Sequence, residues 1–226
     1  MNIQILYEDD YLVVCIKPSG IATQSKKVGT PDMVSLLKNH IYQNSTKKEE
    51  PYVAVIHRLD QPVSGILVFA KSPWAAKELN RQLQHGEFGK YYKALLSKRP
   101  LRETDTLEDY LIKDGKTNMS CICESNMTGA KKAVLKYRII EKNIGEMTVA
   151  DGATLVEVEL QTGRHHQIRV QMAGMGCPIE GDVKYGIAST GIERKSIALC
   201  AYRLEFIHPK THKKLQYECN PLDFWE

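Results

Sequence analysis

An imidazole, a guanidinium and a carboxylate stand close together in the string HRLD at residues 57–60. Burying such groups costs free energy unless each one has a partner. The simplest interpretation is that Arg58 pairs with Asp60 and ties down a turn. The alternative is that Asp60 performs chemistry, because an aspartate carboxylate can serve as a nucleophile in covalent catalysis.

Two short apolar runs, residues 53–56 and 66–70, flank the HRLD string and must position it. Short apolar runs bounded by turn residues are typical of buried strands. Pro62 and Gly65 supply such turn residues between the two runs. We therefore expect Asp60 on a turn set against the core.

The whole stretch resembles the signature of the RluA-type RNA pseudouridine synthases. The match consists of HRLD, then Ser64-Gly65, then an apolar strand that ends in Ala70-Lys71. In that family the aspartate is the catalytic nucleophile, so the resemblance implies this role for Asp60. Pro62-Val63 replaces a threonine that many members carry before the Ser-Gly pair, which touches the turn and leaves the aspartate in place.

A second matching pattern is Lys-x-Tyr-x-Ala within residues 90–96, which alternate as in a strand. The resemblance implies that Tyr92 is the active-site tyrosine and offers its ring to the uracil. Tyr91 is expected on the opposite face, because side chains alternate along a strand. Without the resemblance, both tyrosines would be interpreted as strand residues with buried rings.

The third pattern, QTGRHHQIRV at residues 161–170, resembles the family's Thr-Gly-Arg-x-His-Gln-Ile-Arg-Val motif nearly residue for residue. We expect a strand that ends at Thr-Gly and a short helix after it. The resemblance implies that Arg169 forms an ion pair with Asp60. Gln171 stands where many members have histidine, and we assign it no chemistry.

Five further residues are expected to bind the substrate. The target base of a folded RNA must be flipped out, and Arg58 has the length and planarity to stack in the gap. Arg164 and Lys90 are candidates for phosphate contacts, and Gln167 lies with Arg164 among the donors at the start of the predicted helix. Leu199 matches a leucine that lines the base pocket in the family, although an ordinary core leucine fits equally well.

The predicted fold class is α+β. A hairpin is expected from residues 2–6 and 11–17, antiparallel strands within 106–123 and 132–149, and helices that begin at Thr30-Pro31 and Ser72-Pro73. The resemblance runs from about residue 17 to 209. It implies the pseudouridine synthase fold: a long, curled, mostly antiparallel sheet flanked by a few helices, with a central RNA-binding cleft. We expect one catalytic domain over residues 1–226, with no N-terminal S4-like RNA-binding domain.

Composition and charge indicate which partners and which location fit the chain. The net charge is +4 with clustered lysines and arginines, which suits a polyanion such as RNA. No apolar run is long enough to cross a bilayer, and the acidic N-terminus is unlike a signal peptide, so we expect a cytoplasmic location. Cys121 and Cys123 lack the C-x-x-C spacing of zinc knuckles, so we expect no metal. We also expect a monomer that needs no cofactor.

The predicted activity is the isomerisation of specific uridines to pseudouridine in structured rRNA or tRNA. The sequence leaves open whether Asp60 attacks C1′, attacks the uracil ring, or acts through a glycal. One alternative is a catalytically inactive RNA-binding protein of the same fold. Another is a glycoside or nucleoside hydrolase, which would need Glu180 or Asp182 as the acid.

Overall fold

The structure is a computed structural model, and it describes residues 3–25, 27, 29–46, 49–140, 152–186 and 196–225. The chain divides into two compact units, each of which contains both helix and strand. The first unit comprises Met1–Gly89 and Ala201–Phe224, and the second comprises Lys90–Cys200 and Trp225–Glu226. The single domain expected over residues 1–226 stays a prediction.

The first unit is built on strands whose central members are buried throughout. Its strands are β1 (Ile5–Glu8), β2 (Leu12–Lys17), β3 (Ala54–Val55), β4 (Ser64–Ala70), β10 (Leu199–Ile207, of which the first two residues belong to the second unit) and β11 (Lys214–Glu218). They are hydrogen-bonded in the order β1–β2–β4–β10, with β3 beside β4 and β11 beside β10. Every residue of β2 and of β4 is buried, which explains their continuous apolar sequences. The predicted N-terminal hairpin is confirmed.

Two helices accompany this sheet, and each begins at a residue that caps it. Helix α1 (Met33–Asn44) starts at Asp32, two residues after the predicted Thr30, because the Asp32 carboxylate accepts a hydrogen bond from the Ser35 N–H and Ser35 reciprocates. Helix α2 (Pro73–Gln84) starts as predicted, with Ser72 as the cap and Pro73 in the first turn. A short 3-10 turn, Pro221–Asp223, follows β11.

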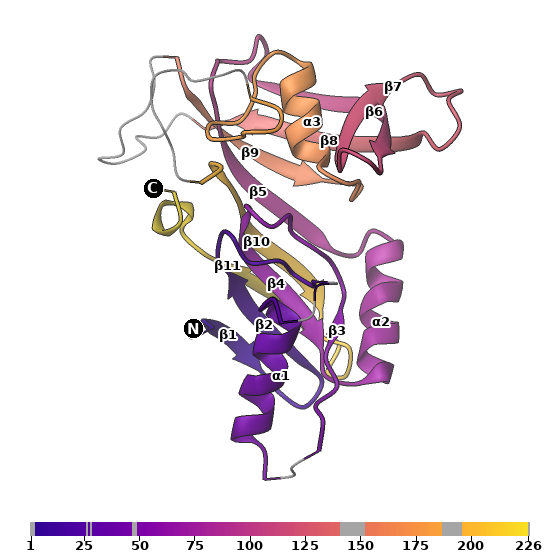
Figure 1. Cartoon of the computed structure of the whole chain (residues 1–226), viewed down its shortest axis with the longest axis vertical. Helices are drawn as coiled ribbons and strands as arrows, with labels where there is room; N and C mark the ends of the chain where they lie inside the picture. Colours follow the sequence, from indigo (N-terminus) through magenta and orange to yellow (C-terminus); the bar gives the residue numbers. More distant parts are fainter. Residues whose placement is uncertain are drawn as a thin grey trace. The chain divides into compact units, whose positions relative to one another are not determined.

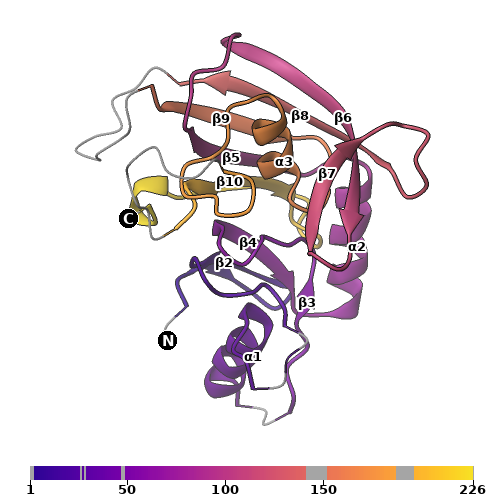
Figure 2. The same cartoon turned by 45° about the horizontal axis from the view of Figure 1, so that its top comes forward.

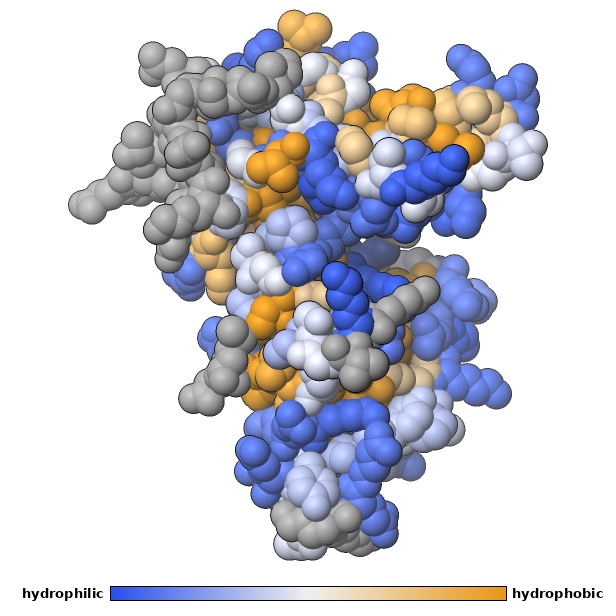
Figure 3. Space-filling model, viewed as in Figure 1, coloured by the Kyte–Doolittle hydropathy of each residue, from blue (hydrophilic) through white to orange (hydrophobic). Residues whose placement is uncertain are grey.

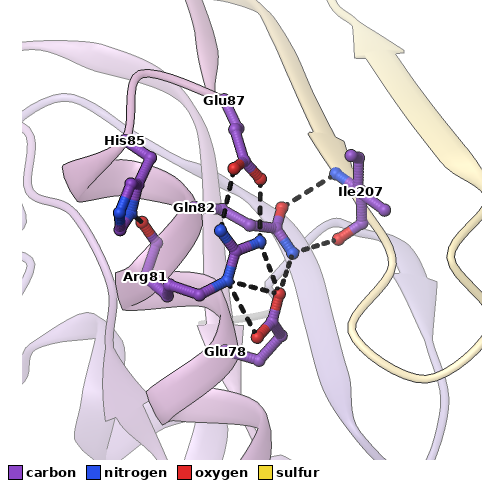
Figure 4. Close-up of polar contacts among 6 residues, drawn as sticks. All are labelled: Glu78, Arg81, Gln82, His85, Glu87 and Ile207. Carbon is purple, nitrogen blue, oxygen red and sulfur yellow. Dashed lines mark hydrogen bonds and ion pairs between the residues drawn. The ribbon is translucent and has the colours of Figure 1, made fainter.

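Helix α2 is attached to β10 by a buried amide (Figure 4). Gln82 Nε2 donates to the carbonyl of Ile207 at 2.9 Å, and the Ile207 N–H donates to Gln82 Oε1 at 3.0 Å. The side chain therefore bonds to the strand backbone as a neighbouring strand does. Beside it, Arg81 lies between Glu78 and Glu87 on the exposed side of the helix.

The second unit is an antiparallel sheet with one helix against it. Its elements are β5 (Gly89–Leu96), β6 (Thr104–Asp114), β7 (Met119–Cys123), β8 (Lys131–Ile139), β9 (Thr154–Leu160) and α3 (Gln167–Gly174). The strand order is β5–β9–β8–β6–β7. Helix α3 packs on β6 and β7 (Figures 1 and 2). Its Val170 belongs to a buried cluster with Leu111 of β6 and Ala133 of β8. The end of the strand predicted over residues 132–149 lies outside the described residues.

Surface hydropathy differs between elements (Figure 3). Around α1, the visible face of the first unit is largely hydrophilic. Over the β6–β7 hairpin, hydrophobic surface lies next to hydrophilic side chains, and Ile122 and Met127 are exposed hydrophobic residues of this region. No helix in the described part of the chain is both long and apolar enough to pass through a membrane.

Candidate active site

Asp60 lies on a turn that leads from the HRLD string into β4. The Val63 N–H donates to the Asp60 carbonyl at 3.0 Å, which closes the turn, and Asp60 itself is half-buried. Leu59 is buried beside it. The polar segment is therefore set against the core, as predicted from the two flanking apolar runs.

A buried lysine forms hydrogen bonds with this turn and with the segment beside it. Lys17, at the end of β2, has no exposed surface, and its ammonium donates to the carbonyls of Pro18 (2.9 Å), Ile21 (2.7 Å) and Gln61 (3.0 Å). Burial lowers the pKa of Lys17 to about 7, although the charge of Asp60 acts in the opposite direction. The Lys17 side chain, which is positively charged below about pH 7, thus lies near enough to the predicted nucleophile for the Asp60 charge to favour its charged form.

The rest of the segment from Lys17 to Thr23 clamps the turn through side chains and backbone alike. Thr23 Oγ1 donates to the Leu59 carbonyl at 3.0 Å and accepts from the Leu59 N–H at 3.2 Å. Ser19 Oγ donates to the Pro62 carbonyl at 2.8 Å. Gly20 and Gln61 exchange two further hydrogen bonds, of 2.9 and 2.8 Å. Six hydrogen bonds in all join these two segments.

The roles of Lys17, Ser19 and Thr23 were not among the predictions from the sequence. The Lys-Pro-Ser-Gly string at residues 17–20 gave no specific signal, because Pro-x-Gly ends many strands. One signal was present, since a lysine that continues an apolar strand has to bury its charge or leave the strand face.

The other two polar residues of the HRLD string have separate surroundings. His57 Nε2 accepts a hydrogen bond from the Val68 N–H at 3.3 Å, and its ring lies 6.3 Å from that of Phe88. Arg58 is exposed and donates to Gln24 Oε1 at 3.2 Å. The long guanidinium of Arg58 is therefore at the surface, where stacking in RNA would require it, and that role stays a prediction.

Gly65 allows β4 to approach β10 closely. Its φ is +128°, and a Cβ at this position would overlap the Ala201 carbonyl oxygen and lie 2.6 Å from the Ala201 nitrogen. Only glycine fits such a backbone conformation and such a contact. The Ser-Gly of the sequence pattern is thus explained by packing.

Arg169 in the second unit forms a buried ion pair with Asp182. Arg169 Nε lies 2.8 Å from Asp182 Oδ2, and Arg169 Nη2 lies 2.7 Å from Oδ1. The side chains are 4% and 1% exposed. Asp182 also accepts the N–H groups of Lys184 and Tyr185. Four N–H groups in all donate to the Asp182 carboxylate, two from the Arg169 side chain and two from the backbone.

The guanidinium of Arg169 is further held by an aromatic network. Its Cζ lies 5.1 Å from the centre of the Tyr185 ring, within the range of a cation–π contact. The Tyr185 hydroxyl accepts the Ser120 N–H at 2.7 Å and bonds to His166 Nδ1 at 2.7 Å. His166 has a left-handed backbone, with φ of +54°, and its ring stacks on that of His165 at 3.7 Å.

Gln167 is buried at the start of α3, and its amide organises the preceding loop. Its Oε1 accepts hydrogen bonds from Thr162 Oγ1 at 2.7 Å and from the Arg164 N–H at 3.0 Å. Its Nε2 donates to the Val134 carbonyl at 3.1 Å. These contacts give Gln167 a positioning role for the loop, while its predicted contact with substrate is untested.

The remaining predicted site residues also lie in the second unit. Tyr92 is buried on β5, opposite Val158 of β9. Leu199 is buried at the start of β10. Lys90 is half-buried and Arg164 is exposed. Asp60 belongs to the first unit and Arg169 to the second, so the expected Asp60–Arg169 pair joins residues of different units and stays a prediction.

Within the described ranges, no group of three or more His, Cys, Asp or Glu side chains is arranged to hold a metal ion. Cys15 is buried, and burial raises the pKa of its thiol to about 12, so it stays protonated at neutral pH.

Comparison with solved structures defines the fold class. The structure described as Human RNA Pseudouridylate Synthase Domain Containing 4 matches with a TM-score of 0.76 at 22% identity, over 96% of this chain and 88% of that one. Human RNA Pseudouridylate Synthase Domain Containing 1 matches with the same TM-score at 21% identity. The fold is therefore the α+β fold of the pseudouridylate synthases, as expected.

Sequence comparison then identifies the family. The family model described as RNA pseudouridylate synthase matches residues 11–174. An uncharacterised RNA pseudouridine synthase of Bacillus subtilis is 32% identical over 96% of this chain and 68% of its own length. Ribosomal large subunit pseudouridine synthase C of Vibrio cholerae is 33% identical over 94% of this chain and 64% of its own length. The chain belongs to the RNA pseudouridylate synthase family, and it spans about two thirds of the length of these curated relatives.

Proposed function

We propose that this protein isomerises specific uridines of ribosomal or transfer RNA to pseudouridine, with Asp60 as the nucleophile. Family membership supports the reaction class. The clamp of six hydrogen bonds on the Asp60 turn is the observation that carries the assignment of the nucleophile. A nucleophile must be held within a fraction of an ångström of its target, and these six hydrogen bonds fix the turn that carries Asp60.

The reaction breaks the bond from uracil N1 to ribose C1′, turns the base and joins C5 to C1′. Substrate and product are isomers, so electrons balance without an oxidant or reductant, and the proton on C5 moves to N1. Asp60 attacks either C1′ or the uracil ring, or removes a ribose proton to give a glycal, and each route begins at this carboxylate. Arg169 is proposed as its cationic partner, and Tyr92 as the aromatic surface under the uracil.

The target base must leave the RNA stack before Asp60 can reach it. Arg58 is proposed to fill the gap, and Leu199 to line the pocket that receives the base. Lys90 and Arg164 are proposed to bind the RNA backbone, and Gln167 to hold the loop that carries Arg164. Relatives named for the ribosomal large subunit favour rRNA as the substrate. A monomer working in the cytoplasm stays the expected form.

The test is pseudouridine mapping of RNA from cells with and without the gene, complemented by wild type, Asp60→Ala or Asp10→Ala. Asp10 is an exposed aspartate of the same unit and serves as the matched control. We expect one or a few sites to vanish with the gene, to return with wild type and Asp10→Ala, and to stay absent with Asp60→Ala.

Two results would contradict the proposal. If Asp60→Ala restores the sites, Asp60 is not the nucleophile. If no site depends on the gene while the protein binds RNA, the protein is not a synthase. Release of free uracil by the purified protein would instead indicate a hydrolase.

A further inference from the structure

Lys90 and Arg164 form a pair of cations, and no carboxylate of the described residues forms an ion pair with either. Lys90 is half-buried, and its ammonium makes no hydrogen bond or ion pair within the described ranges. Its pKa is lowered, first by burial and then by the positive charge of Arg164. A half-buried cation held near a second cation is unfavourable unless an anion joins them.

Arg164 is fixed in place so that part of its guanidinium remains available. Its Nε donates to the Lys132 carbonyl of β8 at 2.8 Å, and its backbone N–H donates to Gln167 Oε1 at 3.0 Å. Gln167 in turn bonds to Val134 on the same strand. This anchoring leaves the terminal nitrogens of Arg164 unused by the described protein, and a guanidinium presents them in a fork that suits phosphate oxygens.

Gly163 keeps space open beside the Lys90 ammonium. A Cβ added to Gly163 would meet one atom within 4 Å, Lys90 Nζ, at 3.8 Å. The φ of Gly163 lies outside the left-handed region, so a side chain is permitted there by the backbone. The absence of a side chain at residue 163 thus gives room for a ligand of Lys90.

The position of this cation pair links it to the substrate. Lys90 and Tyr92 are two residues apart on β5, so their side chains leave the same face of the sheet. Residues two apart on a strand are about 7 Å from each other, which is about the spacing of a nucleotide from its neighbouring phosphate.

We propose that Lys90, Gly163 and Arg164 form a subsite for one phosphodiester group of the RNA, next to the uridine that Tyr92 receives. The Lys90 ammonium and the Arg164 guanidinium bind the non-bridging oxygens of the same phosphate, and Gly163 leaves the space that this phosphate fills. The inference rests on the proposed function, because it takes RNA as the anion.

The first experiment measures binding of a fluorescein-labelled oligouridylate as a function of salt concentration. The variants are Lys90→Gln, Arg164→Gln, the double variant and Gly163→Ala. The control is Lys136→Gln on β8, which removes the same charge from the opposite face of the sheet, because Lys136 is paired through Glu159 with Tyr91. Lys136 is exposed and has no partner within the described ranges.

Each single charge variant is expected to bind about tenfold more weakly, as for the loss of one charge-assisted hydrogen bond. The slope of the logarithm of the binding constant against the logarithm of the salt concentration counts the phosphates that the protein neutralises. Because the two cations share one phosphate, the size of this slope falls by up to about one in each single variant and falls no further in the double variant. Gly163→Ala weakens binding with all charges kept, since its methyl group occupies the phosphate space. Lys136→Gln changes the affinity less than about twofold.

Other results overturn the proposal. If the double variant loses twice the slope of each single variant, the two cations bind separate phosphates. If Gly163→Ala binds like wild type, or Lys136→Gln loses as much as Lys90→Gln, the charges attract RNA only at long range.

The second experiment separates this inference from the proposed function. The titration of the Lys90 side chain is followed by NMR in protein with ¹³Cε-labelled lysine, with inorganic phosphate or with chloride at equal ionic strength. Phosphate is expected to raise the pKa of Lys90 in wild type, and not in Arg164→Gln. Absence of this effect overturns the subsite even if RNA mapping supports the synthase. If phosphate raises the pKa of Lys90 but no pseudouridine site is lost in cells without the gene, the anion site is correct and the proposed reaction is wrong.

Discussion

Asp182 accepts two hydrogen bonds from the guanidinium of Arg169, and both side chains are almost completely buried. A buried cation of this kind depends strongly on its partner, because water cannot replace the lost interaction. The pair lies at the start of the turn from Asp182 to Gly186, whose backbone N–H groups bond back to the same residue. The residue proposed to face the nucleophile is therefore oriented by a carboxylate of its own unit.

Replacing Asp182 by asparagine is expected to lower the free energy of unfolding by about 3 kcal/mol, because the side-chain shape is kept while the negative charge that pairs with the buried Arg169 is removed. Urea denaturation of the purified variant measures this. Asp105→Asn is the matched control, since Asp105 pairs with Arg102 at an exposed site, and exposed pairs contribute less than about 1 kcal/mol. Equal losses in the two variants would show that burial adds nothing to the Arg169–Asp182 pair.

Lys17 is expected to make the stability of the fold depend on pH. Its folded pKa is about 7 and its ordinary value is 10.5, so between these values the folded protein has released a proton that the unfolded chain still holds. The free energy of unfolding therefore rises with pH in this window, by up to about 1.4 kcal/mol per pH unit, and the effect is absent below about pH 7.

Urea denaturation of wild type and Lys17→Met from pH 6 to pH 10 tests this. The difference between their free energies of unfolding is taken at each pH, so that the contributions of the other titrating groups cancel. The advantage of wild type over Lys17→Met should grow with pH above about 7. Lys77→Met on the exposed face of α2 serves as the control and should give a constant difference. A constant difference for Lys17→Met as well would contradict the buried ammonium.

Tyr92 is expected to contribute to substrate binding through its ring and to the chemical step through its hydroxyl. Tyr92→Phe keeps the stacking surface, so KM should change little, while kcat falls about a hundredfold if the phenol helps to remove the C5 proton. Tyr92→Leu should also raise KM, because the aromatic surface is lost. Steady-state kinetics on the RNA identified by mapping measures both. An unchanged kcat in Tyr92→Phe would restrict Tyr92 to stacking.

Gln82 should matter more for stability than its charged neighbour, although Arg81 makes more hydrogen bonds. Gln82→Leu leaves the N–H and carbonyl of Ile207 without their side-chain partners, at a cost of about 2 kcal/mol. Arg81→Leu removes exposed contacts to Glu78 and Glu87 and should cost less than about 1 kcal/mol. Thermal unfolding of the two variants compares them, and the reverse order would contradict this ranking.

The sequence predicted the parts of the fold that local signals determine. Ser72-Pro73 fixes the start of α2 because a capping hydroxyl and a proline act within one turn. The alternation from Lys90 to Leu96 predicted β5 and the opposite faces of Tyr91 and Tyr92, because side chains alternate along a strand; Tyr92 is buried and Tyr91 is half-buried. The start of α1 was placed two residues early, because Asp32 competes with Thr30 as a cap and its reciprocal bond with Ser35 decides the outcome.

The contacts that organise the candidate site were not predictable in this way. Lys17 bonds to Gln61, which is 44 residues away in the sequence, and Arg169 bonds to Asp182, which is 13 residues away. No periodic pattern in the sequence predicts either contact. The family resemblance supplied the candidate residues, but it does not specify which backbone groups hold the Asp60 turn. Those depend on how β2 and β4 are paired, which is a property of the assembled sheet.

The strand order of the first unit has a consequence for the growing chain. Strand β4 lies between β2, which is synthesised before it, and β10, which follows most of the second unit. While the ribosome makes the intervening residues, the edge of β4 that will receive Ala201 is paired with β3 at Phe69 and Ala70, and the part of this edge near Gly65 still awaits β10. Open strand edges are where unfinished chains associate with one another. A nascent chain stalled before Ala201 should therefore need a chaperone to stay unaggregated.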